Sequence, residues 1–195
     1  MSDTSDNNEK KVGMLRIDLQ ASIGKSNLDP RKLSSFQRIL MTTDGTVTEI
    51  LEAQLWESIQ VVKLYQDLVE LDTAVPYLDV EPQSRALVRK VMLQGKLSHK
   101  NYIYAESIII PERLDDKLKD GLLNFQKPIG LLMLEDRLET FREILSCNLE
   151  PAEEVAQHFD IAPESNLVSR TYRIFANRVP IMLITEKFPE TSFRN

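Results

Sequence analysis

A single carboxylate interrupts an otherwise apolar, strand-like run near the end of the chain. Within residues 180–189, a period of two places Glu186 on the same face as Met182, Ile184 and Phe188. An ionised carboxylate that is buried without a partner costs on the order of several kcal/mol. Either this face is therefore solvated, or another group compensates the charge of Glu186.

Two arginines occupy comparable positions in other strand-like segments. Arg89 shares a face with Leu87, and Arg170 shares a face with Tyr172. A guanidinium binds a carboxylate through two parallel hydrogen bonds, and a glutamate accepts a hydrogen bond from a hydroxyl group. The pattern predicts a pocket for a small anion that carries a hydroxyl, with Arg89 as the partner of Glu186 and Arg170 among the substrate-binding residues.

The other charged and aromatic strand residues have simpler interpretations. Glu106 and Arg173 are expected in a surface or cross-strand ion pair. Tyr102, Tyr104 and Tyr172 are expected to pack in the core rather than to stack against a ligand.

Six strand-like segments must position these side chains. Rich in β-branched, aromatic and other apolar residues, they are predicted at 59–69, 84–93, 102–110, 138–149, 166–176 and 181–188. The last two form a hairpin around residues 177–180, and segment 138–149 also has a charge pattern that a helix could carry.

Two short helices precede the first strand and form a helical hairpin. The first begins at Pro30, after the capping residue Asp29, and ends before the triplet 43–45. The second begins at Thr46 or Thr48. Later helical segments are expected at 112–124 and 151–159, with a short segment opened by residues 127–130.

The order of these segments predicts the fold class. No strand is followed by a glycine-rich turn and a helix, which argues against a doubly wound parallel sheet. We expect an α+β fold with a six-stranded antiparallel sheet flanked by helices and a buried small-molecule pocket. With 195 residues, segment 26–195 is predicted to be one domain, and the polar segment 1–25 a flexible N-terminal arm.

Composition excludes several classes of partner. The net charge of −6 argues against a nucleic-acid surface, which needs a basic stripe. No run approaches the ~20 apolar residues of a membrane span. The polar start lacks the apolar core of a signal peptide, so we expect a cytoplasmic protein.

Metal chemistry has little support in the sequence. The two histidines, His99 and His158, lie far apart and lack a set of cysteine partners. Cys147, the single cysteine, lies in an apolar run and is expected to be a small buried residue. We predict no metal site.

Several short motifs occur in the order found in a known family. The chain resembles the chorismate–pyruvate lyases (4-hydroxybenzoate synthetases), and most closely the branch found in mycobacteria and archaea. The segments that carry the resemblance are 87–93, Ala105-Glu106-Ser107-Ile108 with Arg113-Leu114, Lys127-Pro128-Ile129-Gly130, Glu139-Thr140-Phe141-Arg142-Glu143, 170–173 and 180–188.

The resemblance implies cleavage of chorismate to 4-hydroxybenzoate and pyruvate without a cofactor. The arginine that binds the substrate carboxylate in the family falls on Arg89, and the glutamate that contacts the ring hydroxyl falls on Glu186. Ile129 and Gly130 fall in the segment whose backbone amides lie near the substrate carboxylate, and Val47 falls where an apolar residue lines the pocket.

One departure from the family pattern concerns the third strand. Better-known bacterial members carry an arginine where this chain has Glu106, which leaves the role of Glu106 open.

Two other functions remain open at this stage. Ligand-sensing domains of bacterial transcription regulators use a similar fold and bind aromatic acids without turnover. They usually follow a DNA-binding domain, and the segment before Pro30 is too short for one, which favours the enzyme. The substrate could also be a related enolpyruvyl compound such as isochorismate or aminodeoxychorismate, and the sequence makes no prediction of the oligomeric state.

Overall fold

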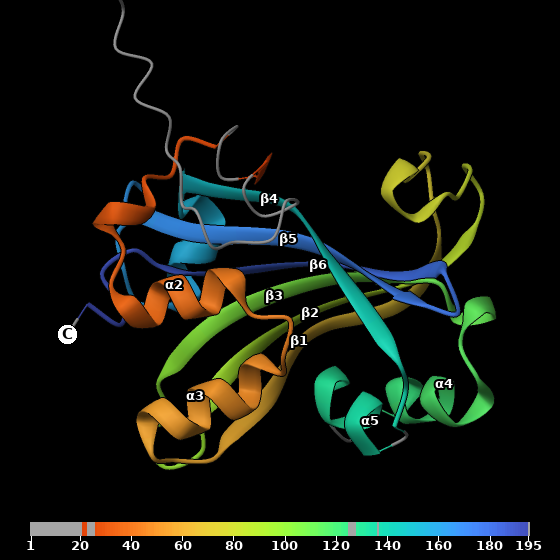
Figure 1. The fold of residues 1–195 in the computed structure, drawn as a ribbon, viewed down its shortest axis with the longest axis horizontal. Helices are drawn as coiled ribbons and strands as arrows, with labels where there is room; N and C mark the ends of the chain where they lie inside the picture. Colours follow the sequence, from red (N-terminus) through yellow and green to blue (C-terminus); the bar gives the residue numbers. More distant parts are fainter. Residues whose placement is uncertain (1–20, 23–25, 125–127, 136, 195) are drawn as a thin grey trace, which may run out of the picture.

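Six antiparallel strands form one sheet with the order β1-β2-β3-β6-β5-β4 (Figure 1). The computed structural model describes residues 21–22, 26–124, 128–135 and 137–194. The strands are β1 (Ile59–Glu70), β2 (Arg85–Gly95), β3 (Asn101–Ile109), β4 (Thr140–Pro151), β5 (Asn166–Ala176) and β6 (Val179–Pro189). The predicted fold class is confirmed, while most of the predicted arm 1–25 lies outside the described residues.

All six predicted strands are present, including β4, whose segment could also have been helical. The β5–β6 hairpin turns more tightly than predicted. Asn177 and Arg178 both have positive φ angles, 51° and 65°. Such a two-residue turn matches the right-handed twist of the flanking strands. Val179 and Pro180 therefore belong to β6 rather than to the turn.

The helical hairpin before β1 consists of α2 (Ser35–Thr42) and α3 (Val47–Leu55). The prediction of one continuous helix from Pro30 is wrong, because a 3-10 turn, η1 (Pro30–Lys32), ends before α2 starts. Ser34 and Gln37 form a reciprocal capping box that fixes a new helix start. Asp29 caps η1 as expected, by accepting from the backbone N–H of Arg31.

A second pair of helices lies between β3 and β4. It consists of α4 (Asp116–Leu123) and α5 (Ile129–Glu135), and a 3-10 turn, η3 (Pro111–Arg113), precedes α4. The helix predicted at 112–124 is thus split, because Asp115 accepts from the backbone N–H of Leu118 and caps α4. The helix predicted at 151–159 is instead the 3-10 segment η4 (Glu153–His158).

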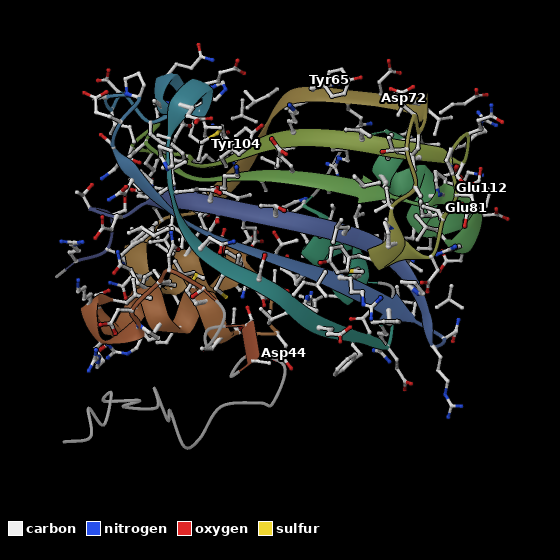
Figure 2. The ribbon with its side chains drawn as sticks, turned by 90° about the horizontal axis from the view of Figure 1, so that it is seen from above. Asp44, Tyr65, Asp72, Glu81, Tyr104 and Glu112 are labelled. Carbon is white, nitrogen blue, oxygen red and sulfur yellow. The ribbon has the colours of Figure 1, made fainter. Side chains whose placement is uncertain are left out.

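Both helical pairs cover the same face of the sheet, which we call the inner face (Figure 1). The main core lies between this face and the helices, and its fully buried members include Leu51, Ile109, Leu118 and Val168. The outer face, seen from above in Figure 2, carries two small apolar clusters, one beside η2 (Pro76–Leu78) and one beside η4. Polar side chains of the strands lie between these clusters.

Candidate active site

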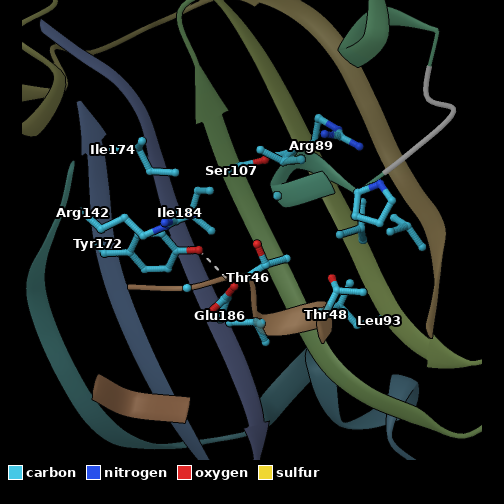
Figure 3. A pocket seen from close by; sticks show the side chains of 17 residues that line it. Thr46, Thr48, Arg89, Leu93, Ser107, Arg142, Tyr172, Ile174, Ile184 and Glu186 are labelled. Atoms are coloured by element: carbon cyan, nitrogen blue, oxygen red, sulfur yellow. Dashed lines mark hydrogen bonds between the residues drawn. The ribbon is translucent and has the colours of Figure 1, made fainter. Parts of the chain in front are cut away.

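A cavity lies between the inner face of the sheet and the two helical pairs (Figure 3). The sheet contributes residues from β1, β2, β3, β4, β5 and β6, and the helical pairs contribute two short segments. The lining residues are Gly45, Thr46, Val47, Thr48, Val61, Arg89, Val91, Leu93, Ser107, Pro128, Ile129, Gly130, Arg142, Tyr172, Ile174, Ile184 and Glu186.

Strand register aligns four of the lining residues in one row across the sheet. Arg89 on β2 is paired with Ser107 on β3, Ser107 with Ile184 on β6, and Ile184 with Tyr172 on β5. Since directly paired residues project to the same side, all four side chains point to the inner face. The row therefore runs from a cation at one end to a phenol at the other.

The next inner-face row lies two residues further along each strand. It contains Val91, Ala105, Glu186 and Arg170, which are paired in the same way. Glu186 is thus the direct neighbour of Arg170 and lies diagonally across from Tyr172. This register explains why a carboxylate can occupy an apolar strand.

Glu186 is held by two hydrogen bonds from β5. Arg170 Nε donates to Oε2 over 2.9 Å, and the Tyr172 hydroxyl donates to Oε1 over 3.0 Å. The second contact is the dashed line in Figure 3. Each carboxylate oxygen can accept a further hydrogen bond, and the Glu186 side chain is 11% exposed, so it can still receive a ligand hydroxyl.

The partner of Glu186 is therefore Arg170, and the expectation that Arg89 fills this role is wrong. Arg170 is not among the residues that line the cavity. Its side chain is 2% exposed, and its Nη1 donates to the backbone carbonyl of Thr43 over 2.9 Å. Arg170 lies behind Glu186, where it fixes the carboxylate and fastens the connection between α2 and α3.

Burial and charge shift the titration of this group of residues. Burial by itself would lower the pKa of Arg170, but the charge and the hydrogen bond of Glu186, together with contributions from Tyr172 and Cys147, outweigh it and the pKa is raised. Burial raises the pKa of Tyr172, and the charge of Glu186 adds to the rise, while Arg170 and Arg142 oppose it. Tyr172 therefore remains a protonated hydrogen-bond donor, and Arg170 remains a cation.

Arg89 lies at the other side of the cavity and is 2% exposed (Figure 3). Burial lowers the pKa of Arg89 to about 10, which still leaves the guanidinium protonated at neutral pH. Strand β3 separates β2 from β6, so the backbones of Arg89 and Glu186 are ~12 Å apart across two strand spacings and two residues. Between them β3 contributes only the small side chains of Ala105 and Ser107, which leaves space for a ligand.

The two helical segments close the cavity opposite the sheet. Val47 and Thr46 come from the start of α3, and Ile129 and Gly130 come from the start of α5. A Cβ atom on Gly130 would lie 2.7 Å from Thr46 Cγ2, so the two segments approach each other as closely as a glycine allows. Of the six site residues expected from the sequence, Arg89, Glu186, Val47, Ile129 and Gly130 thus line one cavity, and Arg170 supports it.

Five polar residues of the cavity were not assigned to it from the sequence: Thr46, Thr48, Ser107, Arg142 and Tyr172. Tyr172 was expected only to pack, yet its hydroxyl binds Glu186 as well as belonging to the core. Arg142 on β4 lines the cavity and donates from Nη1 to the backbone carbonyl of Asp44. Arg142 shares the inner face with Ile144, but the bulge between Ile144 and Ser146 puts Cys147 on that face as well, so a strict period of two counted back from Cys147 would place Arg142 on the outer face.

The charged residues expected outside the site lie on the outer face. Arg173 Nε is 2.6 Å from an oxygen of Glu143, directly across β4 and β5. Glu106 lies 3.8 Å from Lys90 Nζ and accepts from the Tyr104 hydroxyl over 2.6 Å. Both are cross-strand contacts on the face that carries no cavity-lining residue, so Glu106 and Arg173 lie outside the site as predicted, but each has its own partner and they do not pair with each other.

The other side chains that could be reactive or bind a metal ion do not converge on this cavity. Cys147 is fully buried, and burial raises the pKa of its thiol, as expected for a core residue. Among the described residues, no group of three or more His, Cys, Asp or Glu side chains is arranged to hold a metal ion. Within the same residues, every helix is too short or too polar to cross a membrane.

Known proteins resemble this chain over most of its length. A family model described as "Chorismate pyruvate-lyase Rv2949c-like" matches residues 41–194. The chorismate pyruvate-lyase of Mycobacterium leprae is 31% identical over 172 residues, which cover 85% of this chain and 79% of that protein. The chorismate pyruvate-lyase of Mycobacterium tuberculosis is 28% identical over 174 residues, or 87% of each chain.

A solved structure shows the same fold in a different kind of protein. The effector domain of PhnF from Mycobacterium smegmatis superposes with a TM-score of 0.59 at 12% identity. The match covers 74% of this chain and 88% of that domain. At this identity the similarity concerns the fold alone.

Proposed function

This chain belongs to the Rv2949c-like chorismate pyruvate-lyase family, and we propose that it cleaves chorismate to 4-hydroxybenzoate and pyruvate. The observation that carries the proposal is the arrangement of charge in one buried cavity. Arg89 lies at one side, and Glu186, already held by Arg170 and Tyr172, lies at the other. Chorismate has a ring carboxylate and a ring hydroxyl at opposite ends of a six-membered ring, so its polar groups match this arrangement.

Arg89 is proposed to bind the ring carboxylate. A guanidinium in a buried site forms strong, directional hydrogen bonds with a carboxylate, because no bulk water competes for either charge. At a pKa of about 10, Arg89 carries the required charge at neutral pH. The bound carboxylate would in turn favour the protonated form of Arg89.

Glu186 is proposed to accept a hydrogen bond from the ring hydroxyl and to act as the general base that removes the proton from the hydroxyl-bearing carbon. Conversion of chorismate to an aromatic ring requires the loss of the proton on the hydroxyl-bearing carbon and the cleavage of the ether bond at the neighbouring carbon. The electron pair of the broken bond leaves with the enolpyruvate, which takes up a proton to become pyruvate. Arg170 and Tyr172 fix the orientation of the carboxylate, so the base is positioned before the substrate binds.

The reaction gains its driving force from the aromatic ring that it forms. It involves no oxidation and no hydrolysis, so the proposal includes neither a metal ion nor an organic cofactor. The protein has to hold the ring, orient the hydroxyl-bearing carbon and stabilise the charge that develops as the ether breaks. Val47, Ile129 and Gly130 close the cavity over the ring and limit the access of water.

Measurement of pyruvate release from chorismate tests the proposal. Purified protein is incubated with chorismate, and pyruvate is followed with a coupled lactate dehydrogenase assay while 4-hydroxybenzoate is quantified by chromatography. The expected result is equimolar release of both products, well above the spontaneous decay of chorismate without protein. No release at micromolar protein would refute the proposal.

Two related substrates are tested in parallel. Isochorismate and aminodeoxychorismate carry the same enolpyruvyl ether, but they differ in the position or identity of the polar ring substituent. Since Glu186 is proposed to accept a hydroxyl group opposite Arg89, chorismate should have the highest kcat/KM of the three. A higher kcat/KM for either of the other compounds would keep the reaction class but change the substrate.

The alternative is a domain that binds an aromatic acid without turnover. The fold shared with the PhnF effector domain is compatible with it, although a shared fold does not identify a function. Under this alternative, 4-hydroxybenzoate would bind in the cavity while chorismate remained intact. The pyruvate assay and a calorimetric titration with 4-hydroxybenzoate together separate the two functions.

A further inference from the structure

Arg142 is a second arginine in the cavity, and it comes from a different strand than Arg89. It lies on β4 and is paired with Ile174 on β5, one inner-face position away from the pair of Ile144 and Tyr172. Its Nη1 donates to the carbonyl of Asp44, and the carbonyl of the preceding residue, Thr43, accepts from Arg170, the partner of Glu186, so the Arg142 guanidinium lies on the Glu186 side of the cavity. Figure 3 shows Arg142 beside Tyr172, on the opposite side of the view from Arg89.

The two arginines therefore frame the cavity. Strands β2 and β4 are four strand spacings apart, which corresponds to ~19 Å between their backbones in a flat sheet. Both side chains reach into the space between. The cavity lining thus includes two guanidinium groups from opposite parts of the sheet, besides the carboxylate of Glu186 that Arg170 binds.

The substrate of the proposed reaction, chorismate, has two carboxylates, and the aromatic product, 4-hydroxybenzoate, retains only the one on the ring. The second carboxylate of chorismate belongs to the enolpyruvyl group, whose ether oxygen is attached to the carbon next to the hydroxyl-bearing carbon. When the ring carboxylate binds Arg89 and the hydroxyl binds Glu186, the enolpyruvyl group leaves the ring at the Glu186 end. That is the end of the cavity at which Arg142 lies.

We propose that Arg142 forms a second anion subsite, which binds the enolpyruvyl carboxylate and makes the cavity selective for dicarboxylates over monocarboxylates. The inference rests on the proposed function for the identity of the substrate. It extends that function by assigning to Arg142 a contact that chorismate makes and the aromatic product, 4-hydroxybenzoate, does not make. Because 4-hydroxybenzoate lacks the second carboxylate, the product does not use this subsite.

Arg142 also has a structural contact that the test must separate from ligand binding. Its Nη1 donates to the carbonyl of Asp44, in the connection between α2 and α3. The same connection supplies Gly45 and Thr46 to the cavity wall. If Arg142 only held this wall in place, its replacement would weaken every ligand of the cavity to a similar extent.

The experiment compares two ligands that differ by the second carboxylate. The monocarboxylate is 4-hydroxybenzoate, and the dicarboxylate is 3-(carboxymethoxy)-4-hydroxybenzoate, which has the ring carboxylate, the hydroxyl and an ether-linked carboxylate on the neighbouring carbon but cannot eliminate. Calorimetry gives Kd for both ligands with the wild type, Arg142→Gln and Arg142→Lys. Arg173→Gln is the matched control, because Arg173 lies on the adjacent strand and projects to the outer face.

Arg142→Gln is expected to raise Kd for the dicarboxylate by about 10- to 100-fold, the range of one charge-assisted contact. Its effect on Kd for 4-hydroxybenzoate should stay below about threefold, Arg142→Lys should recover part of the loss, and Arg173→Gln should change neither ligand. In the pyruvate assay, Arg142→Gln should raise KM for chorismate more than it lowers kcat.

Two results would overturn the subsite. One is an equal loss of affinity for both ligands, which would assign Arg142 to the cavity wall. The other is no loss for the dicarboxylate. Because calorimetry needs no turnover, a subsite that depends on Arg142 would still be detected if the wild type failed to release pyruvate, and only the proposed function would then fail.

Discussion

The two faces of the sheet carry the same types of charged residue in very different surroundings. On the outer face, Arg173 and Glu143 pair at 2.6 Å with side chains that are 23% and 32% exposed. On the inner face, Arg170 and Glu186 pair at 2.9 Å with side chains that are 2% and 11% exposed. Both pairs connect directly opposed residues of β5 and a neighbouring strand.

The difference in burial determines whether an ion pair is only a surface contact or can take part in ligand binding and proton transfer. Partly exposed pairs contribute little to stability, about 0–1 kcal/mol, since water screens both charges. A buried pair has lost its hydration, and removing one partner leaves an uncompensated charge that costs about 3–5 kcal/mol. The same loss of water makes a buried carboxylate and a buried guanidinium effective groups for binding and proton transfer. The face of the sheet, rather than the residue type, therefore determines what these residues can do.

Neutralising one carboxylate on each face should give the largest contrast. Glu186→Gln is expected to lower the free energy of unfolding by about 3 kcal/mol, because Arg170 remains buried without a counter-charge. It should also reduce pyruvate release by at least about 100-fold, since the proposed base is lost. Urea unfolding followed by circular dichroism and the coupled pyruvate assay measure the two effects.

Glu143→Gln is the matched change on the outer face. It should alter the free energy of unfolding by less than about 1 kcal/mol and leave turnover unchanged. The double variant Arg170→Met with Glu186→Met should recover most of the stability lost in Glu186→Gln but none of the activity. Similar effects of Glu186→Gln and Glu143→Gln would contradict the distinction between the faces.

Replacing one arginine on each face should give the second largest contrast, in ligand affinity. Arg89→Gln is expected to weaken the binding of 4-hydroxybenzoate by about 100-fold, because the carboxylate would be desolvated without a partner. Arg173→Gln should change the affinity by less than twofold. Calorimetric titration measures both, and an unchanged Kd in Arg89→Gln would remove Arg89 from the site.

Much of the sheet could be predicted because strand residues alternate between the faces. The period of two placed Glu186, Arg89 and Arg170 each on an apolar face of its own strand, and all three are buried on the inner face. The helices were harder to delimit. Their ends depend on local caps such as Ser34 and Asp115, which split two predicted helices into a 3-10 turn followed by a short α-helix.

The pairing within the site could not be predicted, because it depends on the order of the strands. Alternation gives the face of a residue but not its neighbour. Since β3 separates β2 from β6, Glu186 is adjacent to Arg170 and not to Arg89. The bulge in β4 likewise puts Cys147 out of phase with Ile144 and Arg142, so alternation counted from Cys147 assigns Arg142 to the wrong face.

The helical segments over the inner face allow a third test, because the close contact between Gly130 and Thr46 closes the cavity. In Gly130→Ala the new Cβ would lie 2.7 Å from Thr46 Cγ2, so the two cavity walls have to separate. We expect kcat/KM for chorismate to fall by about tenfold, with little change in the free energy of unfolding. Adding Thr46→Ser, which removes the opposing methyl group, should restore most of the activity. If the second change restores nothing, the contact between Gly130 and Thr46 does not shape the cavity.

The smallest expected effect is that of pH within the neutral range, and it also tests the burial of Arg89. Burial lowers the pKa of Arg89 in the folded protein to about 10, well below its ordinary value. Affinity for benzoate, a carboxylate without a titrating hydroxyl, should therefore be constant within about twofold from pH 6 to 9. Above pH 10 the affinity should decrease with pH, approaching a tenfold loss per pH unit, as the guanidinium loses its proton.

The stability contributed by Arg89 should change in the opposite direction over the same range. A lowered pKa means that the folded state binds the proton less tightly than the unfolded state. Above pH 10, and until this residue titrates in the unfolded chain as well, the unfolded chain therefore holds more protons at this residue, and the contribution of Arg89 to stability rises with pH. Comparing wild type with Arg89→Gln isolates this contribution, because lysines and tyrosines titrate equally in both. An affinity for benzoate that stays constant to pH 11 would indicate that Arg89 is more hydrated than its burial implies, and would reduce the difference between the two faces.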